Sequence, residues 1–305
     1  MPSPKKFNIK IILSFAAVYI IWGTTYLAIK IGIADMPPFF MAMWRYLIAG
    51  VLLLGYSMAR KQHIFKTEVL RNFLLGCFML TFGQAVLFWA ELYVPSGLAA
   101  VLNASLPIWF IVVDRANWKT NLKNQRIIWG ILIGLAGIVL LFKDQSLTGG
   151  GASGNLVIIA SLIIIASCIC WAIGSLYYKH HRKEENLTAD VGWQLLGGMV
   201  SCFVITLFRG ELNGFHFSQV STNTWLAILY LAIAGSVLTF LALYYLLSVR
   251  PASIVGTYAY INPVVAVFLG WAMANESISK WQLAGIAVIL FSAWLVNSSK
   301  LKEGK

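Results

Sequence analysis

The chain repeats one pattern of prolines after roughly half of its length. Val94-Pro95-Ser96 opens an apolar stretch that contains Pro107, and Arg250-Pro251-Ala252 opens a second stretch that contains Pro263. Each proline of the first stretch lies 156 residues before its counterpart in the second. A shared spacing of this kind indicates two tandem copies of one structural unit.

Tryptophans extend the repeat upstream of the prolines. Trp22 lies 149 residues before Trp171, and Trp44 lies 149 residues before Trp193. The match therefore includes the early part of each half as well as the proline-containing part.

The composition assigns the chain to a lipid environment. Only 11% of its 305 residues are charged, 59% are hydrophobic, and the mean hydropathy is +0.78. A soluble domain has about 25% charged residues, and its core cannot enclose so much apolar surface. The net charge of +12 is typical of a membrane protein with basic cytoplasmic loops. We therefore expect no nucleic-acid partner.

Ten apolar stretches are long enough to cross a bilayer, which takes about 20 residues of helix. They are predicted at 11–31, 38–59, 72–92, 96–113, 126–142, 155–178, 190–208, 222–248, 252–273 and 281–298. Five fall in residues 1–147 and five in residues 148–305, and a glycine-rich linker at 149–154 joins the two units. Because each unit crosses an odd number of times, the second lies inverted. The sequence thus predicts an all-α membrane protein whose ten transmembrane helices form two inverted five-helix repeats around a central cavity.

Positive charge orients this arrangement in the bilayer. If the N-terminus is cytoplasmic, 18 of the 23 lysines and arginines lie on the cytoplasmic side, and the outer loops hold only Lys143, Arg209 and Lys280. Cytoplasmic loops of membrane proteins carry such an excess of Lys and Arg. Both termini are therefore predicted to be cytoplasmic.

Five short motifs resemble those of a known family. They are Ile21-Trp22-Gly23, Trp44 to Gly50, Phe88 to Ala100, Cys170-Trp171-Ala172 and Tyr260-Ile261-Asn262-Pro263. Together with the ten spans and the matched prolines, they are similar to the EamA-type branch of the drug/metabolite transporter superfamily. The resemblance implies two inverted repeats around a central cavity, with spans five and ten at the periphery and often at a homodimer contact. It also implies a bacterial inner-membrane protein that exports metabolites, amino acids or drugs.

Three charged side chains, Lys30, Arg45 and Glu91, fall within predicted spans. A charge at the bilayer centre costs about 2.5–3.5 kcal/mol on insertion scales, so such residues are commonly functional. Lys30 can instead extend to the interface, and Arg45 can instead be held by carbonyls or a carboxylate in a structural contact. We expect Glu91 to lie near Arg45 or Lys30, where it could gate the outer mouth, bind a charged substrate or carry a proton.

Helical spacing places further candidates beside these charges, because residues four and seven apart share one helix face. Two such faces are predicted to line the cavity: Trp22, Tyr26 and Lys30 in the first span, and Gln84, Phe88 and Glu91 in the third. The remaining candidates are polar or aromatic residues of other spans: Asn103, Trp171, Trp193, Gln194, Tyr244, Tyr258 and Asn262. The amides can instead bond between helices, and tryptophan and tyrosine can instead lie at the membrane interface.

Pro107 and Pro263 are the candidate hinges. Proline inside a helix removes a hydrogen bond and clashes with the preceding turn, so spans four and nine are predicted to kink there. Equivalent kinks in both repeats favour a hinge for alternating access, although proline also serves ordinary packing.

Span five carries a stripe of glycines, Gly130, Gly134 and Gly137. In membranes such a stripe marks a close helix contact. The contact can lie within the monomer or across a dimer, and the sequence leaves both open.

These features favour a secondary-active carrier that exports small molecules by alternating access, and metabolite uptake or counter-exchange is the alternative. The predicted spans contain no histidine and no metal-ligand spacing, and the loops contain no nucleotide-binding motif. We therefore expect neither an enzyme nor a cofactor or metal site. A channel would more often need a repeated filter, which the sequence does not show. The expected partners are a small-molecule substrate, the lipid bilayer and a second copy of the chain.

Overall fold

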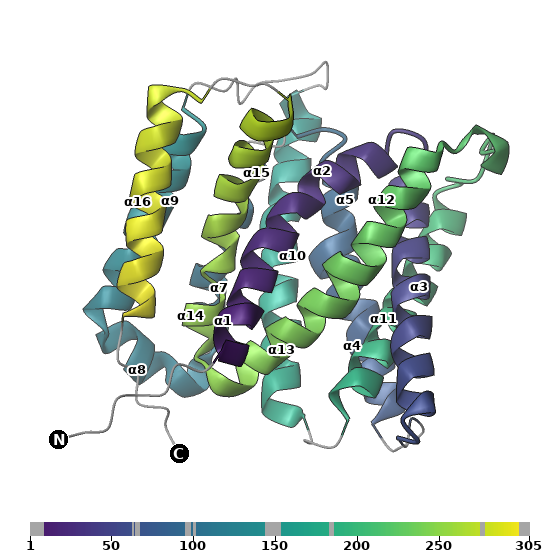
Figure 1. Cartoon of the computed structure of the whole chain (residues 1–305), viewed down its shortest axis with the longest axis horizontal. Helices are drawn as coiled ribbons and strands as arrows, with labels where there is room; N and C mark the ends of the chain where they lie inside the picture. The colour runs from purple at the N-terminus through teal and green to yellow at the C-terminus, as the bar shows by residue number, and fades with distance from the viewer. Residues whose placement is uncertain are drawn as a thin grey trace.

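The computed structural model describes residues 9–62, 64, 68–94, 99, 102–143, 154–182, 186–274 and 278–298. Every regular element within these ranges is a helix (Figure 1). The α-helices of the first half are α1 (Ile9–Ala16), α2 (Trp22–Gly32), α3 (Pro38–Ala59), α4 (Val69–Leu80), α5 (Val86–Ala90), α7 (Leu106–Val113), α8 (Trp118–Lys123) and α9 (Gln125–Leu141). Those of the second half are α10 (Gly154–His181), α11 (Leu187–Phe208), α12 (Thr222–Ala232), α13 (Thr239–Val249), α14 (Ala252–Val255), α15 (Tyr258–Ala274) and α16 (Lys280–Asn297).

Eight helical stretches of the described chain are long and apolar enough to cross a membrane. They are Ile9–Gly32, Pro38–Ala59, Val69–Ala90, Asn155–His181, Leu187–Phe208, Thr222–Val249, Ala252–Leu269 and Lys280–Asn297. The apolar helix α9 is shorter, with 17 residues. The span predicted at 96–113 is described only in part, with α7 as its second portion, and most of the linker predicted at 149–154 lies outside the described residues. The all-helical membrane architecture is confirmed, and the number ten stays a prediction.

Local sequence explains where several helices begin. Pro38 stands in the first turn of α3, where its missing N–H has no partner to lose. Ser279 and Gln282 form a reciprocal capping box at the start of α16. Ser221 caps α12 by accepting a hydrogen bond from the backbone N–H of Thr224 at 3.3 Å.

Helices of the two halves pack against each other throughout the bundle. Helix α3 lies against α11 and α12, and α2 lies against α12 and α15. Likewise, α10 of the second half lies against α4, α5 and α7 of the first half. Each half therefore contributes one helix, α2 or α10, that packs against several helices of the other half.

Helices α9 and α16 form a pair at one edge of the bundle (Figure 1). The glycine stripe of α9 faces α16: a Cβ added at Gly130 would lie 2.3 Å from Cγ2 of Val296, and one at Gly137 would lie 2.8 Å from Cγ1 of Ile289. Both distances are too short for real atoms, so only glycine allows this approach. The stripe is thus used within the monomer.

Three spans contain a π-helical turn: η1 (Ala17–Ile21), η2 (Thr81–Ala85) and η5 (Ile233–Leu238). A π-turn shifts the hydrogen-bond ladder by one residue and is frequent at functional sites. Gly83 in η2 and Gly235 in η5 lie 152 residues apart, so these two turns fall at nearly equivalent positions of the two halves.

Successive spans run between two faces of the bundle. We call the face at which α1 begins and α16 ends, the lower one in Figure 1, the termini face. Most of the described basic residues lie at helix ends on that face: Lys10, Arg60, Lys61, Arg71, Arg115, Lys119, Lys123, Arg126, Lys179, Arg182 and Arg250. The helix ends of the opposite face hold Lys30, Lys143, Arg209 and Lys280.

Candidate functional site

A cavity of about 60 Å³ lies between the two halves, in the middle of the spans. This volume has room for a small number of water molecules. Nine of the predicted site residues line it: Trp22, Tyr26, Arg45, Gln84, Phe88, Asn103, Trp171, Tyr258 and Asn262. The lining also includes Thr25, Ile29, Gly83, Leu87, Leu106 and Cys168.

Aromatic rings form one wall of the cavity. The ring of Trp22 lies 5.8 Å from that of Trp171, its counterpart in the repeat, and 4.7 Å from that of Tyr258. Phe240 completes the cluster at 6.0 Å from Trp22 and 5.8 Å from Trp171. Edge-on contacts of this kind hold the rings in fixed positions. The cavity therefore presents rigid apolar surfaces to any molecule inside it.

Arg45 is held by the π-turn η5. It is 1% exposed, its Nε donates to the hydroxyl of Ser236 at 2.8 Å, and its Nη2 donates to the carbonyl of Gly235 at 2.8 Å. The same carbonyl accepts a hydrogen bond from Nε1 of Trp22 at 3.1 Å. Of the two partners predicted for Glu91, Arg45 is thus already occupied by a backbone carbonyl and a hydroxyl. This is the structural contact that the sequence left open for Arg45.

Glu91 lies directly after α5, outside the cavity lining. Among the described residues its Oε1 is buried and has no hydrogen-bond partner. Lys30 attracts it electrostatically, but Lys30 itself is exposed and does not line the cavity either. Lys30 therefore fits the alternative in which its ammonium group extends to the membrane interface.

Amides and hydroxyls connect the helices around the cavity. Nδ2 of Asn103 donates to the hydroxyl of Tyr26 at 2.9 Å, and the thiol of Cys168 donates to Oδ1 of Asn103 at 3.2 Å. The hydroxyl of Tyr46 donates to Oε1 of Gln84 at 2.9 Å. Asn103 therefore bonds between helices, as the structural alternative predicted, and it also faces the cavity.

Asn262 joins two further segments. In the amide orientation that satisfies its surroundings, its nitrogen donates to the carbonyl of Tyr258 at 2.9 Å and to that of Tyr19 at 3.1 Å. The hydroxyl of Tyr19 in turn bonds the hydroxyl of Thr257 at 2.6 Å. The amide thus ties α15 to the π-turn η1.

Three predicted site residues lie between the cavity and the termini face instead of in the lining. Nε1 of Trp193 donates to the carbonyl of Ile64 at 2.8 Å. The hydroxyl of Tyr244 donates to Oε1 of Gln194 at 2.5 Å, and both side chains are buried. They were placed in the cavity by repeat alignment and residue type, neither of which specifies how far a helix is rotated or how deep a residue lies.

The two candidate hinges differ in position. Pro107 stands in the first turn of α7, after a break at Ala104 and Ser105, so it does not kink a continuous helix. Pro263 does lie inside α15. The break in span nine falls earlier, at Gly256 and Thr257. Pro107 therefore begins a helix instead of kinking one, and the hinge role of the two prolines stays a prediction.

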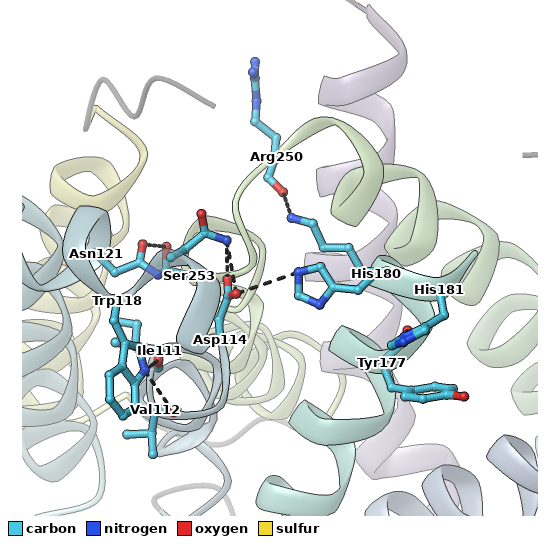
Figure 2. Close-up of polar contacts among 12 residues, drawn as sticks. Ile111, Val112, Asp114, Trp118, Asn121, Tyr177, His180, His181, Arg250 and Ser253 are labelled. Carbon is cyan, nitrogen blue, oxygen red and sulfur yellow. Dashed lines mark hydrogen bonds and ion pairs between the residues drawn. The ribbon is translucent and has the colours of Figure 1, made fainter. Parts of the chain in front are cut away.

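A polar cluster joins the halves at the termini face (Figure 2). The carboxylate of Asp114 is 2% exposed, accepts hydrogen bonds of 3.1 and 3.0 Å from Nδ2 of Asn117, and lies 3.9 Å from Nε2 of His180. Beside it, the hydroxyl of Ser253 donates to Oδ1 of Asn121 at 3.2 Å. These contacts link α8 and the end of α7 to α10 and α14.

Some lining residues missed from the sequence carried a detectable signal. Thr25 and Ile29 lie three and seven residues after Trp22, and Leu87 lies three after Gln84, so the same helical faces include them. Cys168 carried no such signal, because a buried cysteine reads as a small core residue. Among the described residues, no group of three or more His, Cys, Asp or Glu side chains is placed to hold a metal ion.

Comparisons with known proteins agree with this architecture. The EamA-like transporter family matches residues 9–143 and 158–298. The uncharacterized inner membrane transporter YedA of Escherichia coli K12 is 35% identical over 287 residues, which cover 93% of this chain and 89% of YedA. The uncharacterized transporter YoaV of Bacillus subtilis is 24% identical over 89% of this chain and 91% of its own. One solved crystal structure shares the fold with a TM-score of 0.77 at 19% identity, covering 95% of this chain and 96% of that chain.

Both matched segments together span most of the chain, and each falls in one of the two halves. An identity of 35% over 287 residues, as found for YedA, is high enough to show that two proteins belong to one family. The chain therefore belongs to the EamA-like transporter family.

Proposed function

We propose that this transporter is a secondary-active carrier that exports small organic molecules by alternating access. The observation that carries the proposal is the cavity between the halves. Its walls come from α2, α3, α5 and α7 of the first half and from α10 and α15 of the second. When one repeat rocks against the other, a site at their interface opens first to one side of the membrane and then to the other.

The proposal includes ten membrane helices in two inverted repeats of five. The reciprocal packing supports it, since α2 inserts among helices of the second half and α10 among helices of the first. The near-equivalent π-turns η2 and η5 also support it, because inverted copies keep such irregular turns at matching positions. Residues 1–147 and 148–305 would form the two repeats. A homodimer through α9 and α16 belongs to the same proposal.

The orientation is proposed from charge. The termini face carries most of the described basic residues and would be cytoplasmic. The relative YedA is named as an inner membrane transporter, which supports a bacterial inner-membrane location for this chain.

The cavity lining suggests the type of cargo. Its rings and amides suit a small molecule with apolar surface and a few hydrogen-bonding groups. Export is favoured by the resemblance of the motifs, and uptake or counter-exchange is the alternative. Transport of an unchanged molecule, and not catalysis, is the proposed activity.

Counterflow in proteoliposomes tests the carrier mechanism. A ligand panel is first screened by thermal shift on the purified protein, and a hit is then used in radiolabelled form. For a carrier, unlabelled ligand inside the vesicles accelerates entry of labelled ligand. Trp171→Ala, which removes part of the cavity wall, should reduce this exchange at least tenfold, by analogy with loss of a central aromatic contact. Phe208→Ala is the control, because Phe208 is 88% exposed at the end of α11, away from the cavity and from the proposed dimer contact. Flux without trans-stimulation would contradict a carrier.

A further inference from the structure

A series of hydrogen bonds, buried at its inner end, leads to the half-buried carboxylate of Asp190. The hydroxyl of Tyr244 donates to Oε1 of Gln194 at 2.5 Å, and Nε2 of Gln194 donates to Oδ1 of Asn72 at 3.3 Å. Nδ2 of Asn72 donates to Oδ1 of Asp190 at 2.7 Å, and the hydroxyl of Tyr178 donates to Oδ2 at 2.9 Å. Each of these four hydrogen bonds is donated in the direction of Asp190. We call these five residues the Asp190 gate.

The Asp190 gate lies between the cavity and the termini face. On α10, Trp171 lines the cavity and Tyr178 follows it by seven residues, which is about 10 Å along a helix. The rings of Tyr178 and Tyr244 are 4.2 Å apart, and the hydroxyl of Tyr244 lies 3.6 Å from Sδ of Met79. These contacts fill the space below the cavity.

The gate also joins the two halves. Asn72 belongs to α4 of the first half, and the other four residues belong to α10, α11 and α13 of the second. A rocking motion that moves α4 away from α10 and α11 would open the cavity toward the termini face. The hydrogen bonds of Asn72 to Asp190 and Gln194 would then break.

The donors that face Asp190 favour its ionised form. A carboxylate accepts hydrogen bonds at both oxygens, whereas a carboxylic acid presents a proton on one of them. The amide nitrogen of Asn72 can only donate, so a proton on Oδ1 would face it without an acceptor. Protonation also removes the charge that makes such hydrogen bonds roughly twice as strong as neutral ones. A protonated Asp190 therefore holds the gate less tightly.

We propose that Asp190 is a proton-binding site that controls access to the cavity from the termini face. With Asp190 ionised, the gate is closed. A proton bound to the carboxylate weakens the contacts to Asn72 and Tyr178 and opens it. This inference rests on the proposed alternating-access function and names the ion that governs one side of the cavity.

Other charged groups face Asp190 from the neighbouring helices. Arg71 and Glu68 approach from the start of α4, where they pair with each other, and Arg182 approaches from the end of α10. Tyr178 and Tyr244 are the titratable groups of α10 and α13 that face it. The hydrogen bonds from Asn72 and Tyr178 to the carboxylate are all formed, so the described structure shows the closed gate.

Cys168 provides a natural reporter for the test. Its thiol lines the cavity and is 2% exposed. A membrane-impermeant, anionic methanethiosulfonate is added from the termini-face side of sealed vesicles between pH 5.5 and 8.5. Labelling of each native cysteine is quantified by mass spectrometry and normalised to glutathione. This correction matters because the thiolate fraction falls in acid, which opposes the expected effect.

For the wild type, normalised labelling of Cys168 should rise as the pH falls. Asp190→Asn should be labelled about tenfold faster than the wild type at pH 8, the change expected from losing one hydrogen bond to a charged group, and should show no further rise in acid. Asp114→Asn is the matched control. It removes a buried carboxylate at the same face whose contacts in the described part of the chain are to Asn117 and His180, outside the gate, and it should keep the wild-type pH profile.

Two results would overturn the inference. In the first, Cys168 of Asp190→Asn is labelled as slowly as in the wild type and with the same pH profile. In the second, the pH dependence of labelling is lost in Asp114→Asn and kept in Asp190→Asn. Tyr244→Phe keeps the test decisive if Asp190→Asn does not fold. It removes the first donor and should speed labelling at pH 8 while the rise in acid remains, and unchanged labelling would count against the gate. The measurement needs no substrate, so a failure of counterflow would reject the carrier mechanism and leave this result standing.

Discussion

At the scale of single residues, the hydrogen-bond partners of a buried polar group explain why that group is tolerated inside the bundle. Arg45 is the deepest cation of the described chain, and its hydrogen bonds go to Gly235 and Ser236 of a π-turn. A π-turn leaves a carbonyl outside the regular ladder, and in lipid such a group needs another donor. Arg45 and Trp22 supply that donor to Gly235, so the charge stabilises an irregular turn.

Replacing Arg45 with methionine should therefore lower stability before it affects binding. Loss of hydrogen bonds from a buried charged group costs about 1.5–3 kcal/mol each, so the unfolding temperature in detergent should drop by several degrees. Ser236→Ala removes only one acceptor and should cost about 1 kcal/mol. Arg45→Met with unchanged stability but no ligand binding would show instead that Arg45 acts on the cargo.

Glu91 is the residue whose buried oxygen Oε1 lacks a partner among the described residues. Because Oε1 has no hydrogen bond to lose within the described part of the chain, Glu91→Gln should fold normally while it changes the pH profile of transport. The assay is initial-rate transport in proteoliposomes at imposed pH gradients. Asp35→Asn is the control, because Asp35 is a carboxylate that follows α2 at the face opposite the termini face. An unchanged rate and pH profile in Glu91→Gln would remove Glu91 from the mechanism.

At the scale of elements, glycines decide how closely helices approach. A Cβ added at Gly76 of α4 would lie 1.9 Å from the backbone oxygen of Gln194 in α11, whereas one added at Gly55 of α3 meets nothing within 4 Å. The first glycine sits at a backbone contact, and the second sits in open space. The α4–α11 crossing also carries Asn72 and Asp190, so its geometry sets the Asp190 gate.

The same substitution should have opposite effects at these two glycines. Gly76→Ala forces α4 and α11 apart and should destabilise the protein by about 1–3 kcal/mol. Gly55→Ala should stabilise it by up to about 1 kcal/mol, since alanine favours helix over glycine. Thermal unfolding in detergent measures both. Equal and small effects would show that the two helices tolerate a wider separation.

Asp35 holds the first turn of α12 at the opposite face. Hydrogen bonds from the hydroxyls of Ser221 and Thr224 and from the backbone N–H of Ser221 lower the pKa of its carboxyl below the usual range. A lowered pKa means that the contact stabilises the fold above the ordinary aspartate pKa and is lost as the pH falls through the lowered value. Asp35 therefore stays ionised between pH 5.5 and 8.5.

The unfolding temperatures of the wild type and Asp35→Asn should accordingly differ by a constant amount near neutral pH. The difference should shrink below about pH 4, where the carboxyl of an unfolded aspartate is already protonated. A difference that changes between pH 6 and 8 would contradict the assignment of these hydrogen bonds.

At the scale of the whole molecule, the halves are interlocked and not side by side. α2 and α10 each lie against helices of the other half, and α9 and α16 form a pair at the edge (Figure 1). A cavity enclosed in this way changes its opening when one half tilts against the other. The proposed function therefore depends on the inverted arrangement.

Cysteine accessibility tests that arrangement directly. Lys61→Cys and Lys183→Cys should be labelled from the same side of the membrane, and Lys143→Cys from the other. Lys61 follows the second span of the first repeat, and Lys183 follows the first span of the second repeat, which has the opposite orientation. The measurement uses an impermeant maleimide on cells and on inverted vesicles. Labelling of Lys61→Cys and Lys183→Cys from different sides would contradict the inverted repeats.

The sequence by itself determined the class of protein and the helical stretches. Hydropathy along the chain specified an all-helical membrane protein, since a run of apolar residues can satisfy its backbone in lipid only as a helix. Helical spacing on α2 and α5 also placed Trp22, Tyr26 and Phe88 toward the interior, where they line the cavity. Both signals are local, so one chain segment contains all the information they need.

Only the tertiary structure decided which partner each buried polar group has. Arg45 bonds residues about 190 positions away, and Asn72 bonds residues about 120 positions away. Gln194 and Tyr244 were expected in the cavity and instead belong to the Asp190 gate. The physical reason is that helix rotation, depth and crossing distance result from contacts between distant segments. Composition and spacing along a single helix do not contain those contacts.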